Sequence, residues 1–282
     1  TLSLGDNYSL SLTGGTVFSI TPKAVTVTPT AGQGKVYGSA DPVLRYTNTE
    51  LVGSDTFSGA LSREPGNNVG SYAITQGSLA LSSNYTLQFV EGIIFEITPK
   101  PLTASITADN KVYDGTAQAS ATGSVPAAEV VNGDIVAVTV SNARFADKHV
   151  GENKTVTADV AISNSNYVLG NATATASAAI TAKPITGAFT AADKVYDGTT
   201  AASVTGVSLL ETIAGDDVAL SAGTATFADT NVGAAKEVGL AGAVLEGSDK
   251  YNYNLTEVAS AFADITPKAA SVTPIASSKV YG

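Results

Sequence analysis

The 282-residue chain contains no cysteine, no methionine and no tryptophan, and only one histidine. Without cysteine there is no disulfide, no thiolate metal ligand and no cysteine nucleophile. A serine-type catalytic triad would have to use His149, because such triads need a base. The repeats described below place Asn68 and Asn231 at the same position, so we interpret His149 as a turn residue. We therefore expect no catalytic residues and no enzyme activity.

Charged residues are also scarce, at 14%, and the formal net charge is −10. Nucleic-acid binding needs a basic face, and the chain has no cluster of lysine or arginine. No stretch approaches the roughly 18 apolar residues of a membrane-spanning helix. We therefore expect no nucleic-acid partner and no membrane insertion. Threonine, serine, valine and glycine are abundant while good helix formers are few, which predicts an all-β protein.

Four short phrases recur in the same order along the chain. The phrase Lys-Val-Tyr begins at Lys35, Lys111, Lys194 and Lys279, at intervals of 76, 83 and 85 residues. Ile-Thr-Pro-Lys (once Ile-Thr-Ala-Lys), Asn-Tyr-x-Leu and Val-Gly repeat with the same period. Self-similarity at a fixed spacing indicates a modular array, and about 80 residues suit a small independent domain.

We predict three complete modules, named here the first (24–99), second (100–183) and third (184–268) module. Residues 1–23 are interpreted as the C-terminal strands of a preceding module, and residues 269–282 as the first strand of a following one. We expect each module to have a hydrophobic core of its own.

The module boundaries carry prolines and no Gly/Ser-rich linker. Proline fixes φ and favours an extended conformation for the residue before it. We therefore expect the modules, in contact with their neighbours in the chain, to stack end to end as a stiff monomeric rod. The prolines concerned are Pro22, Pro99, Pro184 and Pro267.

Alternating residues predict the strands within each module. Leu102, Ala104 and Ile106 should share one buried face. Residues 134–140 are almost continuously apolar and predict a strand buried on both faces, and Leu209–Ile213 is the best candidate for a short helical turn. Regularly spaced short strands with turn signals between them are typical of a sandwich or barrel.

Acidic residues next to glycines raise the question of a metal site. Asp114 and Asp197 precede glycines, and Asp147 and Asp229 end matching Phe-Ala-Asp segments. Calcium binds carboxylate oxygens, but Asp-Gly is also the usual start of a hairpin turn. We interpret these residues as turn residues and expect no metal and no cofactor, with calcium as the alternative.

The repeated lysine and tyrosines admit two interpretations each. Lys111 could form an isopeptide bond, or could be a solvated lysine whose stem lies along Tyr113 while Val112 packs in the core. The Asn-Tyr tyrosines could line a sugar-binding face, or could be core residues whose hydroxyls satisfy backbone groups. We favour the structural interpretation in both cases. The tyrosines are Tyr85, Tyr167 and Tyr253.

The motif Tyr-Asp-Gly at 113–115 and 196–198 gives the second and third modules a resemblance to the YDG domain. The first module resembles the related MBG domain of the YG type, through "YGSADPVLRYT" at 37–47, "NYTLQFV" at 84–90 and its closing Ile-Thr-Pro-Lys. Tyr281-Gly282 suggests another such module, and the Ile-Thr-Ala-Lys that precedes the third module is a small departure.

The resemblance implies a long bacterial surface or secreted protein similar to filamentous-haemagglutinin-type adhesins, which act in cell adhesion and biofilms. It implies no catalytic residues. The expected fold is a tandem array of immunoglobulin-like β-sandwich modules, with β-grasp-like modules as the alternative. The expected function is an extracellular stalk that projects an adhesive region. The alternative is direct binding of extracellular polysaccharide or host-cell glycan, with or without calcium, which needs a recurring exposed aromatic or acidic groove.

Overall fold

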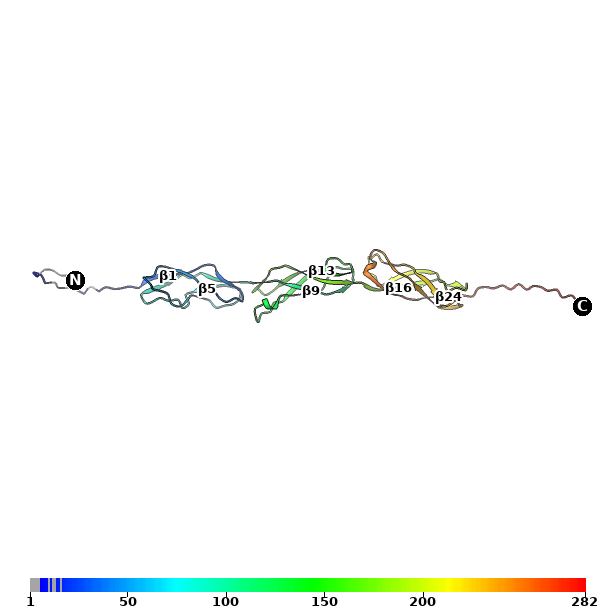
Figure 1. Ribbon diagram of the computed structural model, residues 1–282, viewed down its shortest axis with the longest axis horizontal. Coiled ribbons are helices and arrows are strands. Elements are labelled where there is room, and N and C mark those ends of the chain that lie inside the picture. The colour runs from blue at the N-terminus through cyan, green and yellow to red at the C-terminus, as the bar shows by residue number, and fades with distance from the viewer. Residues whose placement is uncertain (1–5, 10, 12–13, 16) are drawn as a thin grey trace. The chain divides into compact units, whose positions relative to one another are not determined.

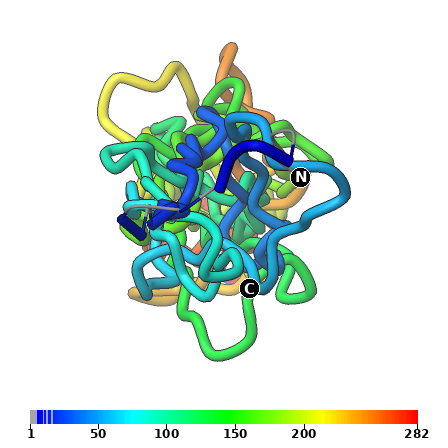
Figure 2. Tube along the Cα trace, turned by 90° about the vertical axis from the view of Figure 1, so that its left-hand side faces the viewer, coloured from blue at the N-terminus to red at the C-terminus, as the bar shows by residue number. Residues whose placement is uncertain are grey.

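The computed structural model describes residues 6–9, 11, 14–15 and 17–282 (Figure 1). These residues form short β-strands, two 3-10 turns and irregular segments, with no α-helix among them. Figure 2 draws the same chain as a tube along its Cα trace. The all-β prediction is confirmed. No helix in this part of the chain is long and apolar enough to cross a membrane.

The first module contains two sheets. One has the order β3-β1-β6 and the other β2-β7-β5-β4. Alternate residues of β1 are buried, as period-2 alternation requires, and Phe95 and Ile97 of β7 are buried from the other sheet. The strands are β1 (Lys23–Pro29), β2 (Gln33–Val36), β3 (Tyr46–Asn48), β4 (Ser62–Arg63), β5 (Gly70–Thr75), β6 (Tyr85–Phe89) and β7 (Ile94–Thr98).

The second module has a larger sheet of order β10-β15-β13-β12 and two small sheets, β11-β9 and β14-β8. A 3-10 turn, η1 (Ala127–Glu129), precedes β12. The strands are β8 (Lys100–Leu102), β9 (Ser105–Ala108), β10 (Lys111–Val112), β11 (Ala121–Ser124), β12 (Val138–Phe145), β13 (Gly151–Ile162), β14 (Tyr167–Leu169) and β15 (Thr173–Thr181).

The third module has sheets of order β18-β16-β23, β17-β24-β21-β20 and β19-β22. The second 3-10 turn, η2 (Lys250–Asn252), leads into β23. The strands are β16 (Lys183–Ala191), β17 (Lys194–Val195), β18 (Val204–Leu210), β19 (Ala219–Leu220), β20 (Thr224–Phe227), β21 (Gly233–Ala241), β22 (Leu245–Glu246), β23 (Tyr253–Val258) and β24 (Ala261–Thr266).

The repeated phrases share a period because their strands pair with one another. The Lys-Val-Tyr strand always lies parallel to the strand of the Ile-Thr-Pro-Lys phrase. Lys35 is opposite Ile97, and the corresponding pairs are Lys111 with Ile180 and Lys194 with Ile265.

By their contacts the residues divide into two compact units, and the division runs through the second module. The first unit contains Thr1–Leu102, Ala128–Ile135 and Asn164–Val168, so it joins the first module to two segments of the second. The second unit contains the remainder of the second module and the whole third module. The module limits given by the sequence stay predictions.

Several local predictions can be compared with the strands. Leu102, Ala104 and Ile106 are buried as expected. The prediction for 134–140 is wrong, because β12 begins only at Val138 and Ile135 is 86% exposed. Asp134 belongs instead to a turn that closes on Val131. The helical turn predicted at Leu209–Ile213 is also wrong, since β18 continues to Leu210.

The described residues before Lys23, and residues 267–282, carry no sheet pairing. The assignment of 1–23 to a preceding module falls partly outside the described residues, and Phe18 and Ile20 are both 96% exposed. Residues 267–282 form no strand. Both assignments stay predictions.

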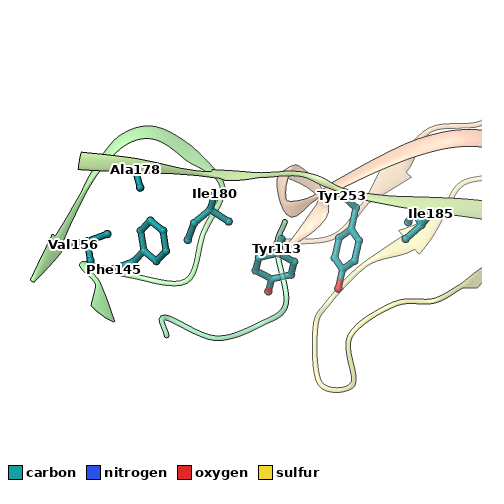
Figure 3. Close-up of a cluster of buried hydrophobic side chains, with 7 residues drawn as sticks. All are labelled: Tyr113, Phe145, Val156, Ala178, Ile180, Ile185 and Tyr253. Atoms are coloured by element: carbon teal, nitrogen blue, oxygen red, sulfur yellow. The ribbon is translucent and has the colours of Figure 1, made fainter. Parts of the chain in front are cut away.

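The expectation of one separate core for each module is wrong for the second and third modules. A single cluster contains Phe145, Ile180 and Tyr113 of the second module together with Ile185 and Tyr253 of the third. Figure 3 shows Tyr113 beside Tyr253, with Ile185 beyond them and Ile180 on the other side. The clusters around Ala104 and around Phe189 do lie within single modules. The shared cluster exists because a tyrosine of each module is buried against the other.

The shared cluster predicts coupled stability. Replacing Ile180, which is fully buried, by alanine should lower the free energy of unfolding by about 2–5 kcal/mol. Amide hydrogen exchange should accelerate in both the second and the third modules. The matched variant Ile106→Ala, in the cluster around Ala104, should accelerate exchange in the second module only. Unchanged exchange over 184–268 in Ile180→Ala would contradict the coupling.

Candidate functional site

Two tyrosines and one aspartate meet where the first module is followed by the second. The hydroxyls of Tyr37 and Tyr167 both donate to Oδ2 of Asp134, at 2.8 Å and 2.6 Å. The two rings pack edge to face with centroids 5.4 Å apart, an arrangement that aromatic pairs favour. All of these residues belong to the first compact unit. We call this set, with Val131, the first joint.

The same arrangement recurs between the second and third modules, within the second compact unit. Tyr113 and Tyr253 both donate to Oδ2 of Asp216, at 2.7 Å and 2.6 Å. Their rings are edge to face at 5.5 Å. Lys148 adds an ion pair to the other oxygen, Oδ1, at 3.1 Å. This set, with Ile213, is the second joint.

In each joint the aspartate and the second tyrosine come from the same module, and a turn of that module holds them together. In the first joint the N–H of Val131 donates to the hydroxyl oxygen of Tyr167 at 2.8 Å, and the N–H of Asp134 donates to the carbonyl of Val131. In the second joint the N–H of Ile213 donates to Tyr253 at 2.9 Å, and the N–H of Asp216 to the carbonyl of Ile213. The hydroxyl therefore accepts one hydrogen bond and donates one.

This turn is a fifth repeated phrase that the sequence analysis missed. A Val or Ile stands three residues before the aspartate, with a glycine of positive φ between them. The signal is present in the sequence, among the turn signals that separate the predicted strands. The three copies are Val52-Gly-Ser-Asp55, Val131-Asn-Gly-Asp134 and Ile213-Ala-Gly-Asp216.

The glycines that follow the first tyrosine of each joint make room for the neighbouring turn. Gly38 and Gly115 have φ values of +80° and +79°, which glycine adopts readily. A Cβ on Gly38 would lie 2.4 Å from the Val131 side chain, and one on Gly115 would lie 2.8 Å from that of Ile213. The Tyr-Gly and Tyr-Asp-Gly motifs thus supply a hydroxyl donor and a side-chain-free surface together.

The repeated asparagine and Val-Gly phrases add a second contact to each joint. The N–H of Val69 donates to Oδ1 of Asn166 at 3.0 Å, and the N–H of Val150 donates to Oδ1 of Asn252 at 3.1 Å. Asn252 is 97% buried as a result of these contacts and is the one buried polar residue among those described. Its side-chain amide also lies 3.3 Å from Nδ1 of His149.

Burial and the shared carboxylate set the protonation of the second joint. Burial, with the hydrogen bond to Asp216, raises the pKa of Tyr253 to about 12. The pKa of Tyr113 is raised for the same reasons. Burial alone would raise the pKa of Asp216, but the hydrogen bonds from Tyr253, Tyr113 and Lys148 outweigh it and the pKa is lowered. The joint is therefore held as neutral tyrosines around an ionised carboxylate.

The structural interpretation of the Asn-Tyr tyrosines is confirmed. Tyr85, Tyr167 and Tyr253 are buried, and each hydroxyl accepts a backbone N–H. Their rings cannot form an exposed sugar-binding row.

The prediction that the valine of the Lys-Val-Tyr phrase packs in the core is wrong, and it is the tyrosine that is buried. Val112 is 52% exposed whereas Tyr113 is 2% exposed, because the third module covers the tyrosine. Lys111 donates to Asp114 at 2.7 Å and to the carbonyl of Thr116 at 2.8 Å, so it closes its own turn. An isopeptide bond to Asp114 would span only that turn and would link no separate strands.

The acidic residues and the histidine lie in turns. Asp114 and Asp197 accept N–H groups two residues later, from Thr116 and Thr199. His149 lies in the bend before β13, where its N–H donates to Asp147 at 2.8 Å. Asp147 and Asp229 pair with lysines, Lys154 and Lys236, at 2.6 Å in both cases. The described residues contain no group of three or more His, Cys, Asp or Glu arranged to hold a metal ion.

Comparison with family models finds known domains over the residues that form the joints. Residues 98–176 and 181–261 match the model of the YDG domain, and together these matches cover more than half of the chain. The chain belongs to the YDG domain family. An MBG domain of the YGX type precedes the two YDG domains, at residues 25–95. A comparison with curated proteins found no match. The tyrosine and glycine of the YDG motif in the first YDG domain are among the residues that contact the next domain.

Removing one hydroxyl should weaken the second joint between the YDG domains. Tyr253→Phe leaves the N–H of Ile213 and the carboxylate of Asp216 each without one partner, so we expect a loss of about 1–3 kcal/mol in unfolding free energy. Urea denaturation measures this loss. Tyr251→Phe is the matched control, because Tyr251 is 79% exposed and lies outside the joint. Equal midpoints for the two variants would contradict the assignment.

The joint should also give the YDG domains a defined pH range. The stability contributed by Tyr253 is present below its ordinary pKa of 10.0 and is lost as the pH rises through about 12. The stability contributed by Asp216 is present above its ordinary pKa of 3.8 and is lost as the pH falls through its lowered value. Thermal melting across this range should show both losses in the wild type. In Asp216→Asn the acid loss should shrink, and an unchanged acid profile would show that another carboxylate is responsible.

Proposed function

We propose that this chain is a non-catalytic extracellular repeat region of a large bacterial surface or secreted adhesin, in which the modules form a stiff stalk. The observation that carries the proposal is the repeated joint, in which one carboxylate binds a tyrosine from each of two neighbouring modules. The proposal includes no enzyme activity, no cofactor and no bound metal.

The joints support stiffness because each makes two separate contacts. In the second joint the tyrosine pair at Asp216 is one, and the bond from Val150 to Asn252 is the other. Two contacts resist rotation of one module on the next better than a single contact does. Between the second and third modules the chain passes from β15 to β16 with one intervening residue, so there is no flexible linker between them.

The shared cluster supports a mechanical role in a second way. Separating the second and third modules would expose Tyr113 and Tyr253, which are 2% and 5% exposed. Burial of apolar surface contributes about 25 cal/mol per Å², so undocking opposes a pulling force. Neighbouring repeats of this kind stabilise one another through their interfaces. A stalk with such interfaces would extend under load before its modules unfold.

The location outside the cell and the link to an adhesive region rest on the family resemblance. Antibodies against these modules should label intact cells of the bacterium that makes the protein, without permeabilisation. Labelling only after lysis would contradict the extracellular location.

The alternative function, glycan binding, needs an exposed row of tyrosines, and the tyrosines considered for it are buried. Nothing in the described residues favours this alternative.

Stiffness can be measured as the width of a distance distribution. The chain has no cysteine, so paired spin labels can be placed at Thr139→Cys and Ser208→Cys, two exposed positions on β12 and β18. We expect a narrow distribution in this background and a broad one after Tyr113→Phe with Asp216→Asn, because the joint then loses the hydrogen bond from Tyr113 and the ion pair with Lys148. Double electron–electron resonance gives the distribution.

The matched control is Asp229→Asn, which removes an exposed ion pair outside the joint and should leave the distribution narrow. A broad distribution before any joint substitution would contradict the stiff stalk. It would leave the hydrogen bonds of the joint, tested by Tyr253→Phe, unaffected.

A further inference from the structure

In the third module, Tyr196 is the equivalent of Tyr37 and Tyr113, the first tyrosines of the two joints. We call this part of a joint, with the glycine that follows, the tyrosine half. The N–H of Tyr196 donates to the carbonyl of Thr266 at 2.9 Å, as that of Tyr113 does to Thr181 at 2.8 Å. The backbone therefore holds both tyrosines in the same way. Tyr196 is nevertheless 40% exposed, against 2% for Tyr113. Its hydroxyl makes no hydrogen bond to any described residue.

The surroundings of Tyr196 match an occupied joint in two further respects. Gly198 has φ of +81°, close to the +79° of Gly115, but no atom lies within 4 Å of its Cβ position, whereas Ile213 fills that place above Gly115. Val232 is 47% exposed, and its equivalent Val150 is partly buried with its N–H bonded to Asn252. A hydroxyl donor, a glycine with open space at its Cβ position and a Val-Gly loop are thus in place together.

The other part of a joint, which we call the aspartate half, consists of the turn with its aspartate and the Asn-Tyr tyrosine. The first module contains such an aspartate half. Tyr85 donates to Asp55 at 2.6 Å, and the N–H of Val52 donates to Tyr85 at 2.9 Å. These are the internal bonds of the aspartate half in both occupied joints. Val52 is 58% exposed and Asn84 is also exposed. The aspartate half therefore forms without a tyrosine donor from another module.

We propose that the face formed by Tyr196, Gly198 and Val232 is a docking site for the aspartate half of a further MBG or YDG module joined after Lys268. In the docked state the apolar residue of the turn would lie over Gly198, as Ile213 lies over Gly115. Its aspartate would accept the hydroxyl of Tyr196, and its Asn-Tyr asparagine would accept the N–H of Val232. The two occupied joints of this chain provide the template for all three contacts.

The occupant must be joined to the same chain for two reasons. Each occupied joint connects modules that follow one another in the chain, and covalent linkage through Pro267-Lys268 would raise the effective concentration of the partner to the millimolar range. In addition, Thr230 stands at the position equivalent to Lys148, so this joint has no added ion pair. It should therefore resemble the first joint, where Asn67 stands at that position. The inference goes beyond the stalk proposal and does not depend on where the protein is located.

The test uses residues 1–268 with one module added. Residues 24–99 replace residues 269–282 directly after Lys268, which reproduces the natural sequence Lys-Ala-Val at the new connection. Hydrogen exchange at the amide of Val232 is measured by NMR in the extended and the 282-residue chains. We expect exchange to be at least about tenfold slower in the extended chain, because this amide becomes bonded in the docked state.

Matched variants separate docking from a general effect of the added module. Tyr196→Phe should restore fast exchange at Val232 in the extended chain and change little in the 282-residue chain, where its hydroxyl has no described partner. Asp55→Asn in the added copy alone should also restore fast exchange. The amide of Val150, in the second joint, should stay protected in all of these variants and serves as the internal reference.

Two exchange results would overturn the proposal. One is equal exchange at Val232 in the two chains while the added module gives the same NMR signals as the natural first module. The other is slow exchange that persists in both variants. If the added first module does not fold, residues 184–268 are added in its place, and failure of both modules to fold at this position also counts against the docking site.

Discussion

A single carboxylate oxygen that accepts two tyrosine hydroxyls is the interaction on which the connection between modules depends. Oδ2 of Asp134 binds Tyr37 and Tyr167, and Oδ2 of Asp216 does the same for its own pair. One tyrosine of each pair comes from the preceding module and the other from the module that contains the aspartate. The carboxylate can be buried because the two hydroxyls replace the water that it loses.

The architecture could be predicted from the sequence to the extent that it is local. The period, the all-β class and the buried face of Leu102, Ala104 and Ile106 follow from spacing and alternation, which operate over a few residues. The hydrogen-bonding role of Tyr85 and its equivalents also follows, since a recurring tyrosine in a sheet needs a partner for its hydroxyl.

The joints themselves were missed because they depend on contacts between modules. The Lys-Val-Tyr strand β10 has only two residues, so alternation cannot tell which face is buried. Tyr113 is buried because a neighbour covers it, whereas Tyr196 in the same motif is half exposed. Likewise 134–140 looks like a buried strand by hydropathy, although its first residue, Asp134, closes a turn with its N–H and accepts two tyrosine hydroxyls with its carboxylate. The repeated Val/Ile-x-x-Asp phrase held this information, but only in comparison across all three modules.

The two halves of a joint lie on different motifs of a module, and this gives every module a direction. In both occupied joints the tyrosine half of one module contacts the aspartate half of the next, and a reversed module would bring together two halves of the same kind, without this hydrogen bond. A gene that duplicates or deletes one whole repeat unit would keep every contact compatible, because each unit presents the same pair of faces to its neighbours. The length of such a protein can then change during evolution without any new interface having to arise.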